Sequence, residues 1–264
     1  MENLLNIIYI VLVIILGLCF GSFLNVVIYR VPNHMNICYP PSHCPNCDYK
    51  LKWYDNIPVL SYIMLGGKCR NCKQPISPRY IIVEILTSVM FLLCYLRFHF
   101  SGYFFLSVIA IMCYICIAFI DFEHYIIPDS LNLILLLVGL ASLFFNMSAR
   151  EYITVNIYDK LIGLGVGVGI FLIVILIEKL IKKEIMGGGD LKLILVSGLF
   201  LGYQLLLLGI FLSALIACLV EIPLSFNKKL RQNHVLPFGP YLVLGFTISL
   251  FVGLDILNLY LSLF

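Results

Sequence analysis

The sequence predicts an all-α polytopic membrane protein with about eight transmembrane helices and a cytoplasmic, zinc-ribbon-like loop between helices 1 and 2. Hydrophobic residues form 62% of the 264-residue chain and charged residues only 12%, whereas about a quarter of the residues of a soluble domain are charged. Long apolar runs recur along the chain, and the one sizeable hydrophilic segment contains two Cys-x-x-Cys pairs. Since no water-soluble core could bury this much apolar sequence, we expect the lipid bilayer to surround most of the chain.

The apolar runs mark the expected spans. A spanning helix needs about 20 apolar residues at 1.5 Å each, and suitable runs cover residues 4–29, 80–96, 103–120, 130–146, 159–178, 191–203, 205–226 and 238–262. Residues 191–226 are too long for one span, so we expect a turn at Gly202-Tyr203-Gln204, giving eight spans of which two are short. We therefore divide the chain into transmembrane helix 1 (1–30), a hydrophilic loop (31–79) and a seven-helix membrane core (80–264).

Basic residues indicate the orientation, because cytoplasmic loops retain Lys and Arg. With the N-terminus outside, fourteen of the 17 basic residues are cytoplasmic: Arg30, Lys50, Lys52, Lys68, Arg70, Lys73, Arg79, Lys179, Lys182, Lys183, Lys192, Lys228, Lys229 and Arg231. The three on the outside are Arg97, Arg150 and Lys160. The formal charge of +3 therefore reflects loop topology, and we expect no nucleic-acid partner.

The hydrophilic loop contains a candidate metal site. Cys44 and Cys47 form one Cys-x-x-Cys pair, and Cys69 and Cys72 form a second after 21 intervening residues. Two such knuckles complete a four-thiolate tetrahedral site, which is typical of structural zinc. The expected cytoplasmic location keeps the thiols reduced. A redox dithiol or a site that no longer binds metal remains an alternative.

Two aspartates are candidate catalytic residues, since ionisable groups at a membrane edge are costly and usually functional. Asp121 ends the third apolar run, and Asp190 follows Gly187, Gly188 and Gly189 at the start of the sixth. The topology places both at similar depth on the cytoplasmic side. Glycines permit unusual backbone conformations and close approach of a substrate or helix, although a flexible linker with a helix cap is the alternative. We interpret Asp129, which opens the next apolar run, as a helix cap.

A pair of carboxylates in a partly dehydrated site shares one proton, because both cannot ionise cheaply. The ionised carboxylate can then take a proton from a water that attacks a peptide carbonyl. The protonated carboxyl can donate toward the carbonyl oxygen and later the leaving amine. The sequence does not decide which aspartate begins protonated, since a coupled pair titrates as a unit.

The chain also resembles a known family through motifs in a fixed order. They are Gly21-Ser-Phe-Leu-Asn-Val-Val-Ile-Tyr-Arg-Val-Pro32, Trp53-Tyr-Asp-Asn-Ile-Pro58, Gly67-Lys-Cys-Arg70, Arg79-Tyr80 with Val83-Glu84, Ile120-Asp121, Ile127-Pro128-Asp129, Gly187-Gly-Gly-Asp190 and Pro237-Phe-Gly-Pro240. This ordered set, which spans nearly the whole chain, is similar to that of the type IV prepilin peptidases, bifunctional leader peptidases and N-methyltransferases with a GxGD-type aspartyl protease site.

The resemblance implies that Asp121 and Asp190 are the catalytic pair, that the four cysteines bind zinc, and that the substrates are prepilins or pseudopilins cut at the cytoplasmic face of the bacterial inner membrane. It further implies methyl transfer from S-adenosylmethionine to the new N-terminus, for which Glu84 and Arg30 are the candidate cofactor-binding residues. The chain has no Rossmann-type glycine fingerprint for that cofactor, and Ser88 stands where many relatives have Gly.

Three other functions remain as alternatives. A peptidase without methyl transfer would keep the aspartates alone. A transporter would use intramembrane carboxylates along an ion path, but the paired repeats expected for it are not found in the sequence. A non-enzymatic scaffold would use the aspartates as helix caps. The sequence leaves open the oligomeric state and the pilus, secretion or DNA-uptake system that is served.

Overall fold

The computed structural model describes residues 2–148, 154–225 and 237–263, so Arg150, Lys228, Lys229 and Arg231 lie outside the described residues. The chain forms two compact units, Met1–Phe100 (unit 1) and Ser101–Phe264 (unit 2). Helices make up most of both units, and the only strands in the described part are two residues long each. The predicted all-α class is therefore confirmed.

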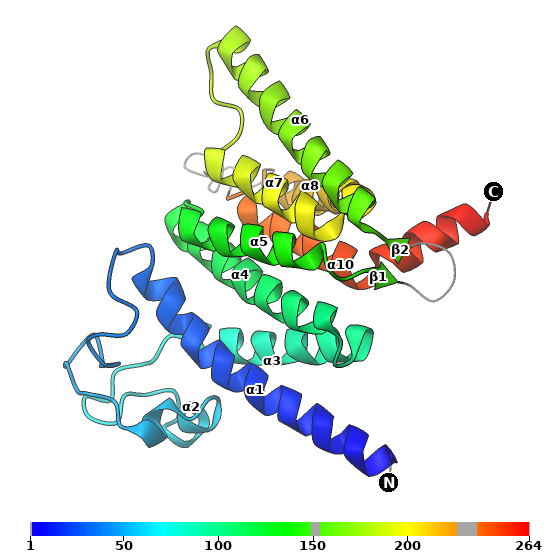
Figure 1. Ribbon diagram of the computed structural model, residues 1–264. Helices are drawn as coiled ribbons and strands as arrows, with labels where there is room; N and C mark the ends of the chain where they lie inside the picture. Colours follow the sequence, from blue (N-terminus) through cyan, green and yellow to red (C-terminus); the bar gives the residue numbers. More distant parts are fainter. Residues whose placement is uncertain (1, 149–153, 226–236, 264) are drawn as a thin grey trace. The chain divides into compact units, whose positions relative to one another are not determined.

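Unit 1 is built on two long helices that pack against each other, α1 (Glu2–Arg30) and α3 (Arg79–Phe98) (Figure 1). Gly17 and Gly21 lie one turn apart on α1 and face α3. A Cβ atom on Gly17 would lie 2.5 Å from Ser88 Cα, and one on Gly21 would lie 2.6 Å from Glu84 Cα. Small residues at this spacing let membrane helices approach closely and gain dispersion contacts.

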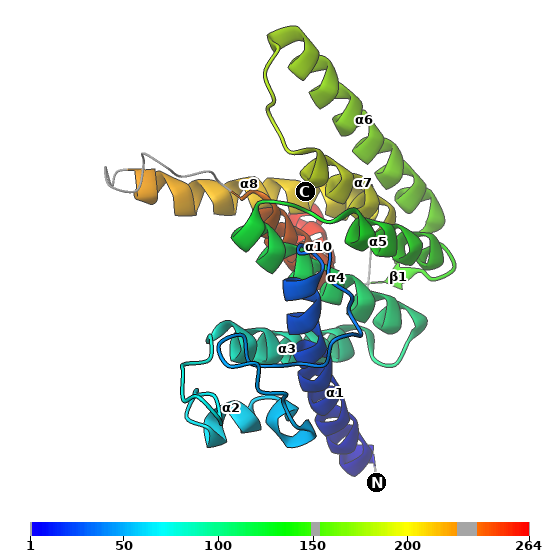
Figure 2. The same cartoon turned by 90° about the vertical axis from the view of Figure 1, so that its left-hand side faces the viewer.

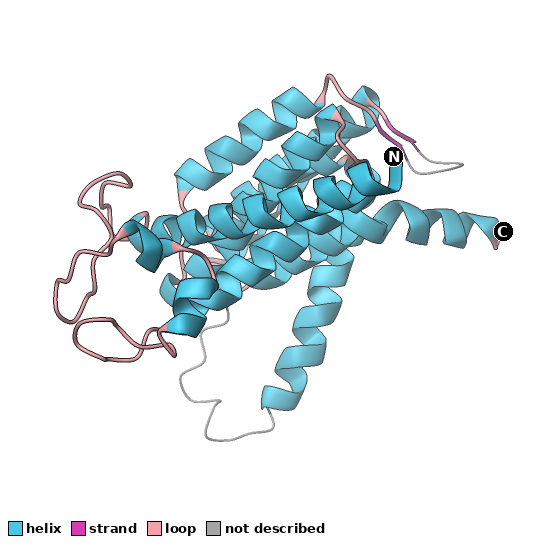
Figure 3. Ribbon diagram, turned by 90° about the horizontal axis from the view of Figure 1, so that it is seen from below, coloured by secondary structure: helices cyan, strands magenta, loops and turns pink. Residues whose placement is uncertain are grey.

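The segment between α1 and α3 contains only two short helical elements, η1 (Trp53–Asn56) and α2 (Leu60–Met64). Figure 3 shows the rest of this segment as loop. Two isolated antiparallel bridges, His43 with Lys50 and Lys68 with Pro75, close the two cysteine knuckles. The backbone–backbone hydrogen bonds of this segment therefore join residues that are close in the sequence.

Unit 2 contains six helices in its described part. In chain order the elements are α4 (Gly102–His124), α5 (Asp129–Ser142), β1 (Met147–Ser148), β2 (Thr154–Val155), α6 (Ile157–Ile181), α7 (Gly188–Leu201), α8 (Tyr203–Ser225) and α10 (Gly239–Ser262). The central element is α7, which contacts α5, α6, α8 and α10. Figure 2 shows α6 packed on α7 over its first part and diverging from it toward its C-terminal end.

In the described residues, eight main helices occur where eight spans were predicted, and six of them are long and apolar enough to cross a membrane: α1, α3, α4, α6, α8 and α10. The other two, α5 and α7, have 14 residues each, or about 21 Å, which is less than the ~30 Å hydrocarbon core. The turn predicted at Gly202 is confirmed, since this residue has φ +83° and separates α7 from α8. The structure groups α3 with α1, whereas the sequence placed it with the membrane core.

Lys160 is buried within unit 2. The sequence placed it among the three cations on the outside and did not predict its burial. Its ammonium donates hydrogen bonds to the carbonyls of Ser142 and Phe145 and lies 5.2 Å from the centre of the Tyr103 ring. A cation is favourable beside the free carbonyls at a helix C-terminus. Lys160 of α6 therefore joins the end of α5 to the start of α4.

Candidate active site and metal centre

Asp121 lies in the last turn of α4 and is a buried residue, 6% exposed. Its Oδ2 accepts a hydrogen bond of 3.0 Å from the backbone N–H of Gly239, the first residue of α10. A buried carboxylate is tolerated only when such donors replace water. The Pro237-Phe-Gly-Pro240 motif thus supplies a donor to Asp121, a role that the sequence analysis did not assign to it.

Asp190 lies in the first turn of α7 and is half-buried. Its Oδ1 is buried and has no hydrogen-bond partner among the described residues. Buried polar atoms are nearly always paired, so one without a partner requires an explanation such as a proton, a water or a bound substrate. This atom is therefore available for chemistry.

The two aspartates lie on helix faces that the structure joins directly. Tyr114 is two turns before Asp121 on α4, and Ser197 is two turns after Asp190 on α7, so each pair shares a helix face. The hydroxyl of Tyr114 donates to Ser197 Oγ at 2.9 Å. The hydroxyl of Tyr103 donates to the Phe200 carbonyl at 3.1 Å, so α4 and α7 run antiparallel. Asp121 and Asp190 therefore lie toward the same end of these two helices.

Glycine is required at two positions around this site because of close contacts. A Cβ on Gly239 would lie 2.6 Å from Asp121 Oδ2, and one on Gly189 would lie 2.8 Å from Ile127 Cβ. The close approach expected for the glycine run is therefore confirmed at Gly189. The unusual backbone conformations that glycine permits are not adopted here, since none of Gly187, Gly188 and Gly189 has a positive φ. Gly187 is instead the N-cap of α7, and Gly188 faces open space.

The segment before Asp190 is held by a residue that the sequence analysis missed. Glu178, near the end of α6, accepts hydrogen bonds from the backbone N–H groups of Ile185 at 3.0 Å and Met186 at 3.2 Å through its Oε1 atom. These bonds tether the connection that leads into Gly187. No periodic pattern marks such a contact in the sequence.

The capping role predicted for Asp129 is wrong. Pro128 occupies the N-cap position of α5, and no side chain of the described residues caps this helix. Asp129 is the first helical residue and forms an exposed ion pair with Lys192 of α7, with 2.7 Å between Oδ1 and Nζ. Its charge still suits the first turn of a helix, although an exposed pair contributes little stability. Asp121 is therefore buried and Asp129 exposed, and this difference distinguishes the candidate catalytic residue from a surface carboxylate.

The four loop cysteines form one cluster in unit 1, as their spacing predicted. Their Sγ atoms all lie within 4.8 Å of one another, with 3.9 Å between Cys44 and Cys72 and 4.0 Å between Cys47 and Cys69. Four sulfurs around a tetrahedral zinc at about 2.3 Å would be about 3.8 Å apart. The donor set and its spacing therefore fit a structural zinc ion.

The backbone of the second knuckle favours a thiolate. The N–H groups of Cys72 and Asn71 point to the Cys69 sulfur and lower the pKa of this thiol to about 7. A thiolate is the form that binds metal. In the first knuckle the backbone N–H of Tyr49 lowers the pKa of the Cys47 thiol, so each knuckle has a donor that favours the negative charge that a divalent cation requires.

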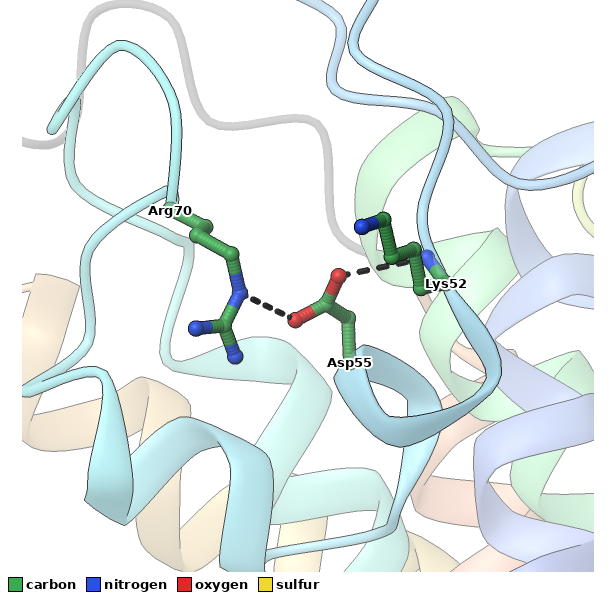
Figure 4. A network of polar contacts seen from close by, with 3 residues as sticks. All are labelled: Lys52, Asp55 and Arg70. Atoms are coloured by element: carbon green, nitrogen blue, oxygen red, sulfur yellow. Dashed lines mark hydrogen bonds and ion pairs between the residues drawn. The ribbon is translucent and has the colours of Figure 1, made fainter.

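An ion pair joins the second knuckle to η1. Arg70, between Cys69 and Cys72, donates from Nε to Asp55 Oδ1 at 2.8 Å, and Asp55 Oδ2 accepts from the backbone N–H of Lys52 at 3.2 Å (Figure 4). The Asp55 side chain is 1% exposed. Since this carboxylate is buried, removal of Arg70 would leave it without its cationic partner. The network therefore fixes η1 relative to the cysteines.

Glu84 and Arg30 both contact loop backbone in unit 1. Glu84 Oε2 accepts from the N–H of Val59 at 2.7 Å. The buried guanidinium of Arg30 donates to the carbonyls of Asn36, Ile37 and Pro40. Both side chains are therefore bonded to loop backbone, and we assign them no step of methyl transfer. Their part in cofactor binding stays a prediction.

Two family models and several known proteins of one description are similar to this chain. The bacterial peptidase A24 N-terminal domain matches residues 15–98, and the type IV leader peptidase family matches residues 108–222. The chain is 32% identical to the prepilin leader peptidase/N-methyltransferase of Pseudomonas aeruginosa over 96% of this chain and 94% of that protein. It is 32% identical to that of Legionella pneumophila over 93% and 92%.

A protein of the same description from Myxococcus xanthus is 39% identical over 77% of this chain, and the match covers 59% of that protein's length. No solved structure is significantly similar to the chain. The chain belongs to the type IV leader peptidase family.

Proposed function

We propose that this chain is a prepilin leader peptidase in which Asp121 and Asp190 are the catalytic residues. The observation that carries the proposal is the arrangement of the two carboxylates, one bound by the Gly239 N–H and the other with a buried oxygen without a partner in the described residues. A purely structural aspartate would have its oxygens satisfied. The relatives' names supply the substrate class.

In this proposal the aspartates share one proton. The ionised carboxylate removes a proton from a water molecule, which attacks the scissile carbonyl, while the protonated carboxyl donates to the carbonyl oxygen and then to the leaving amine. The Gly239 N–H limits the freedom of the Asp121 carboxylate. The absence of a side chain at Gly188, which faces open space, leaves backbone accessible for an extended substrate segment.

The proposed orientation places the N-terminus outside the bacterial inner membrane and the aspartates at its cytoplasmic face. Its support is the distribution of Lys and Arg among the loops. Cleavage at this face would leave the substrate's leader in the cytoplasm and its apolar helix beside the enzyme. Cross-linking from Tyr125, which follows α4, to a substrate's leader in intact cells would test this arrangement.

Zinc is the metal that we propose for the cysteine cluster. Cys44, Cys47, Cys69 and Cys72 would hold it with no open coordination position, so its contribution would be to fix the two knuckles to each other. The Arg70–Asp55 pair would then transmit that rigidity to η1. No catalytic step is assigned to the metal.

Methyl transfer from S-adenosylmethionine to the new N-terminus is the second proposed activity, and the relatives' names are its support. A peptidase without methyl transfer is the other candidate, since Glu84 and Arg30 are already bonded to loop backbone. Co-expression with a type IV prepilin, followed by intact-mass measurement of the product, separates the two. Loss of the leader with one added methyl group supports both activities, loss of the leader alone removes methyl transfer, and an uncut product overturns the proposal.

A further inference from the structure

Unit 1 exposes an apolar surface beside the cysteine knuckles. We call it the α2 surface and define it as Trp53, Leu60, Ile63 and Met64, which are 79%, 58%, 64% and 85% exposed. The last three lie at i, i+3 and i+4, so they share one face of α2. Trp53 is adjacent, because η1 packs against α2. A contiguous apolar patch of this kind marks an interaction site rather than a water-facing surface.

The position of α2 along α3 places this surface at the level of the membrane boundary. The N–H of Val59, directly before α2, donates to Glu84 in the second turn of α3 at 2.7 Å, and Arg79–Phe98 is long and apolar enough to span the bilayer. Val59 has φ +61°, which is strained for a β-branched residue. The bond to Glu84 therefore holds the start of α2 beside a spanning segment, even against backbone strain.

The exposed charges of the segment that contains the α2 surface are predominantly positive. Between Cys44 and Lys73 the exposed cations are Lys50, Lys52, Lys68, Arg70 and Lys73. The acidic residues between Cys44 and Lys73 are Asp48, which is exposed, and Asp55, which is buried and paired with Arg70. Basic side chains next to exposed apolar groups suit the headgroup region of an anionic leaflet, where tryptophan is also enriched.

We propose that the α2 surface lies in the headgroup region of an anionic bilayer. The loop between α1 and α3 would then carry a peripheral membrane contact of its own, in addition to the spanning helices. This contact would hold the cysteine knuckles against the membrane surface. It depends on the lipid composition and is independent of the proposed protease chemistry.

Trp53 is the only tryptophan in the chain, so its fluorescence reports directly on this surface. The full chain is placed in nanodiscs of zwitterionic lipid or of a mixture with anionic phosphatidylglycerol, with acyl chains brominated close to the headgroup. We expect loss of most of the Trp53 emission to brominated lipid, weak quenching by aqueous acrylamide, and stronger lipid quenching in the anionic nanodiscs. A positive control is Trp53→Phe combined with Phe23→Trp, since Phe23 is an exposed residue of the spanning helix α1.

The triple variant Lys50→Gln, Lys52→Gln, Lys68→Gln should lose the extra quenching that anionic lipid gives. The matched control is Lys182→Gln with Lys183→Gln, which removes two exposed cations of unit 2. This control should leave the extra quenching by anionic lipid unchanged. Quenching by acrylamide but not by brominated lipid would overturn the proposal, because Trp53 would face water. Protection from both quenchers would also overturn it, because protein would cover the surface. Equal lipid quenching in the two bilayers would overturn the role of anionic lipid.

Discussion

The cysteine cluster of unit 1 and the aspartate site of unit 2 are assembled over different distances along the chain. Cys44 and Cys72 are 28 positions apart, and backbone turns of their own knuckles orient the thiols. Asp121 and its hydrogen-bond donor Gly239 are 118 positions apart and lie on different helices. A site of the first kind needs only local folding, whereas one of the second kind needs the whole packing of unit 2.

This difference determines what a substitution can damage. Exchange of a cysteine removes a ligand from a local site and should leave the helix packing of unit 2 intact. A single added methyl group near Asp121 changes the fit of α4 against α10. We therefore expect cleavage to respond most to the aspartates and to the groups that pack on them, and less to the cysteines.

The largest expected effect is that of Asp121→Asn or Asp190→Asn. Each exchange keeps the size of the side chain but removes the acid–base function, so cleavage of a prepilin should fall by about 10³-fold or more. Product formation is measured by intact mass after reconstitution with purified substrate. The zinc content should equal that of the wild type in both variants, and normal cleavage by either would refute the assigned pair.

The next effect is that of Gly239→Ala, with Gly165→Ala in α6 as the matched control. The new Cβ at position 239 would lie 2.6 Å from Asp121 Oδ2, whereas nothing lies within 4 Å at position 165. A displaced carboxylate should lower kcat by about 10- to 100-fold, while the control should keep its activity and gain a little helix stability, because alanine favours helix more than glycine. Equal loss in the two variants would show that position 239 does not act through Asp121.

The same contrast explains which parts of the molecule the sequence predicted. The apolar runs predicted the eight main helices and the turn at Gly202, and the spacing of the cysteines predicted their cluster. Both signals are local in the sequence. The two aspartates were found because charge is rare at a membrane edge. The sequence did not predict which face of α5 or of α7 is buried, because most residues of both helices are apolar and show no clear period.

The missed features all depend on contacts between segments that are distant in the sequence. Lys160 was counted among the outside cations, at the start of the predicted span 159–178, but the carbonyls that bind it lie at the end of another helix, α5. The donor role of Gly239 and the tether from Glu178 follow from helix packing, which the pattern of apolar residues does not specify. Asp129 resembles a cap in sequence, yet the preceding proline takes the cap position.

A smaller effect on cleavage is expected from Cys44→Ser combined with Cys69→Ser. This variant should lose its zinc, measured by mass spectrometry of metals, and its hydrophilic loop should become sensitive to protease. Cleavage should fall less than in Gly239→Ala, since unit 2 keeps its own packing. Unchanged metal content would rule out the cysteine site.

The wild-type cluster should also release zinc on acidification. The pKa of Cys69 is lowered to about 7 by the backbone N–H groups of Cys72 and Asn71, so this thiol is partly ionised near neutral pH. Protons compete with metal for each thiolate, and the apparent zinc affinity should therefore fall as the pH falls through about 7. Competition with a chelator at several pH values measures the apparent zinc affinity. A zinc affinity that rises on acidification would contradict thiolate ligation.

The smallest expected effect is that of Glu178→Ala, which removes the acceptor for the Ile185 and Met186 N–H groups. Glu178→Gln keeps an acceptor oxygen, so it should restore most of the activity. Loss of one or two exposed hydrogen bonds is worth about 1 kcal/mol, so kcat should fall by about two- to tenfold with KM nearly unchanged, because the tether positions Asp190 without contacting substrate. If alanine and glutamine behave alike, the tether has no part in catalysis, and Asp190 is held by the packing of α7 alone.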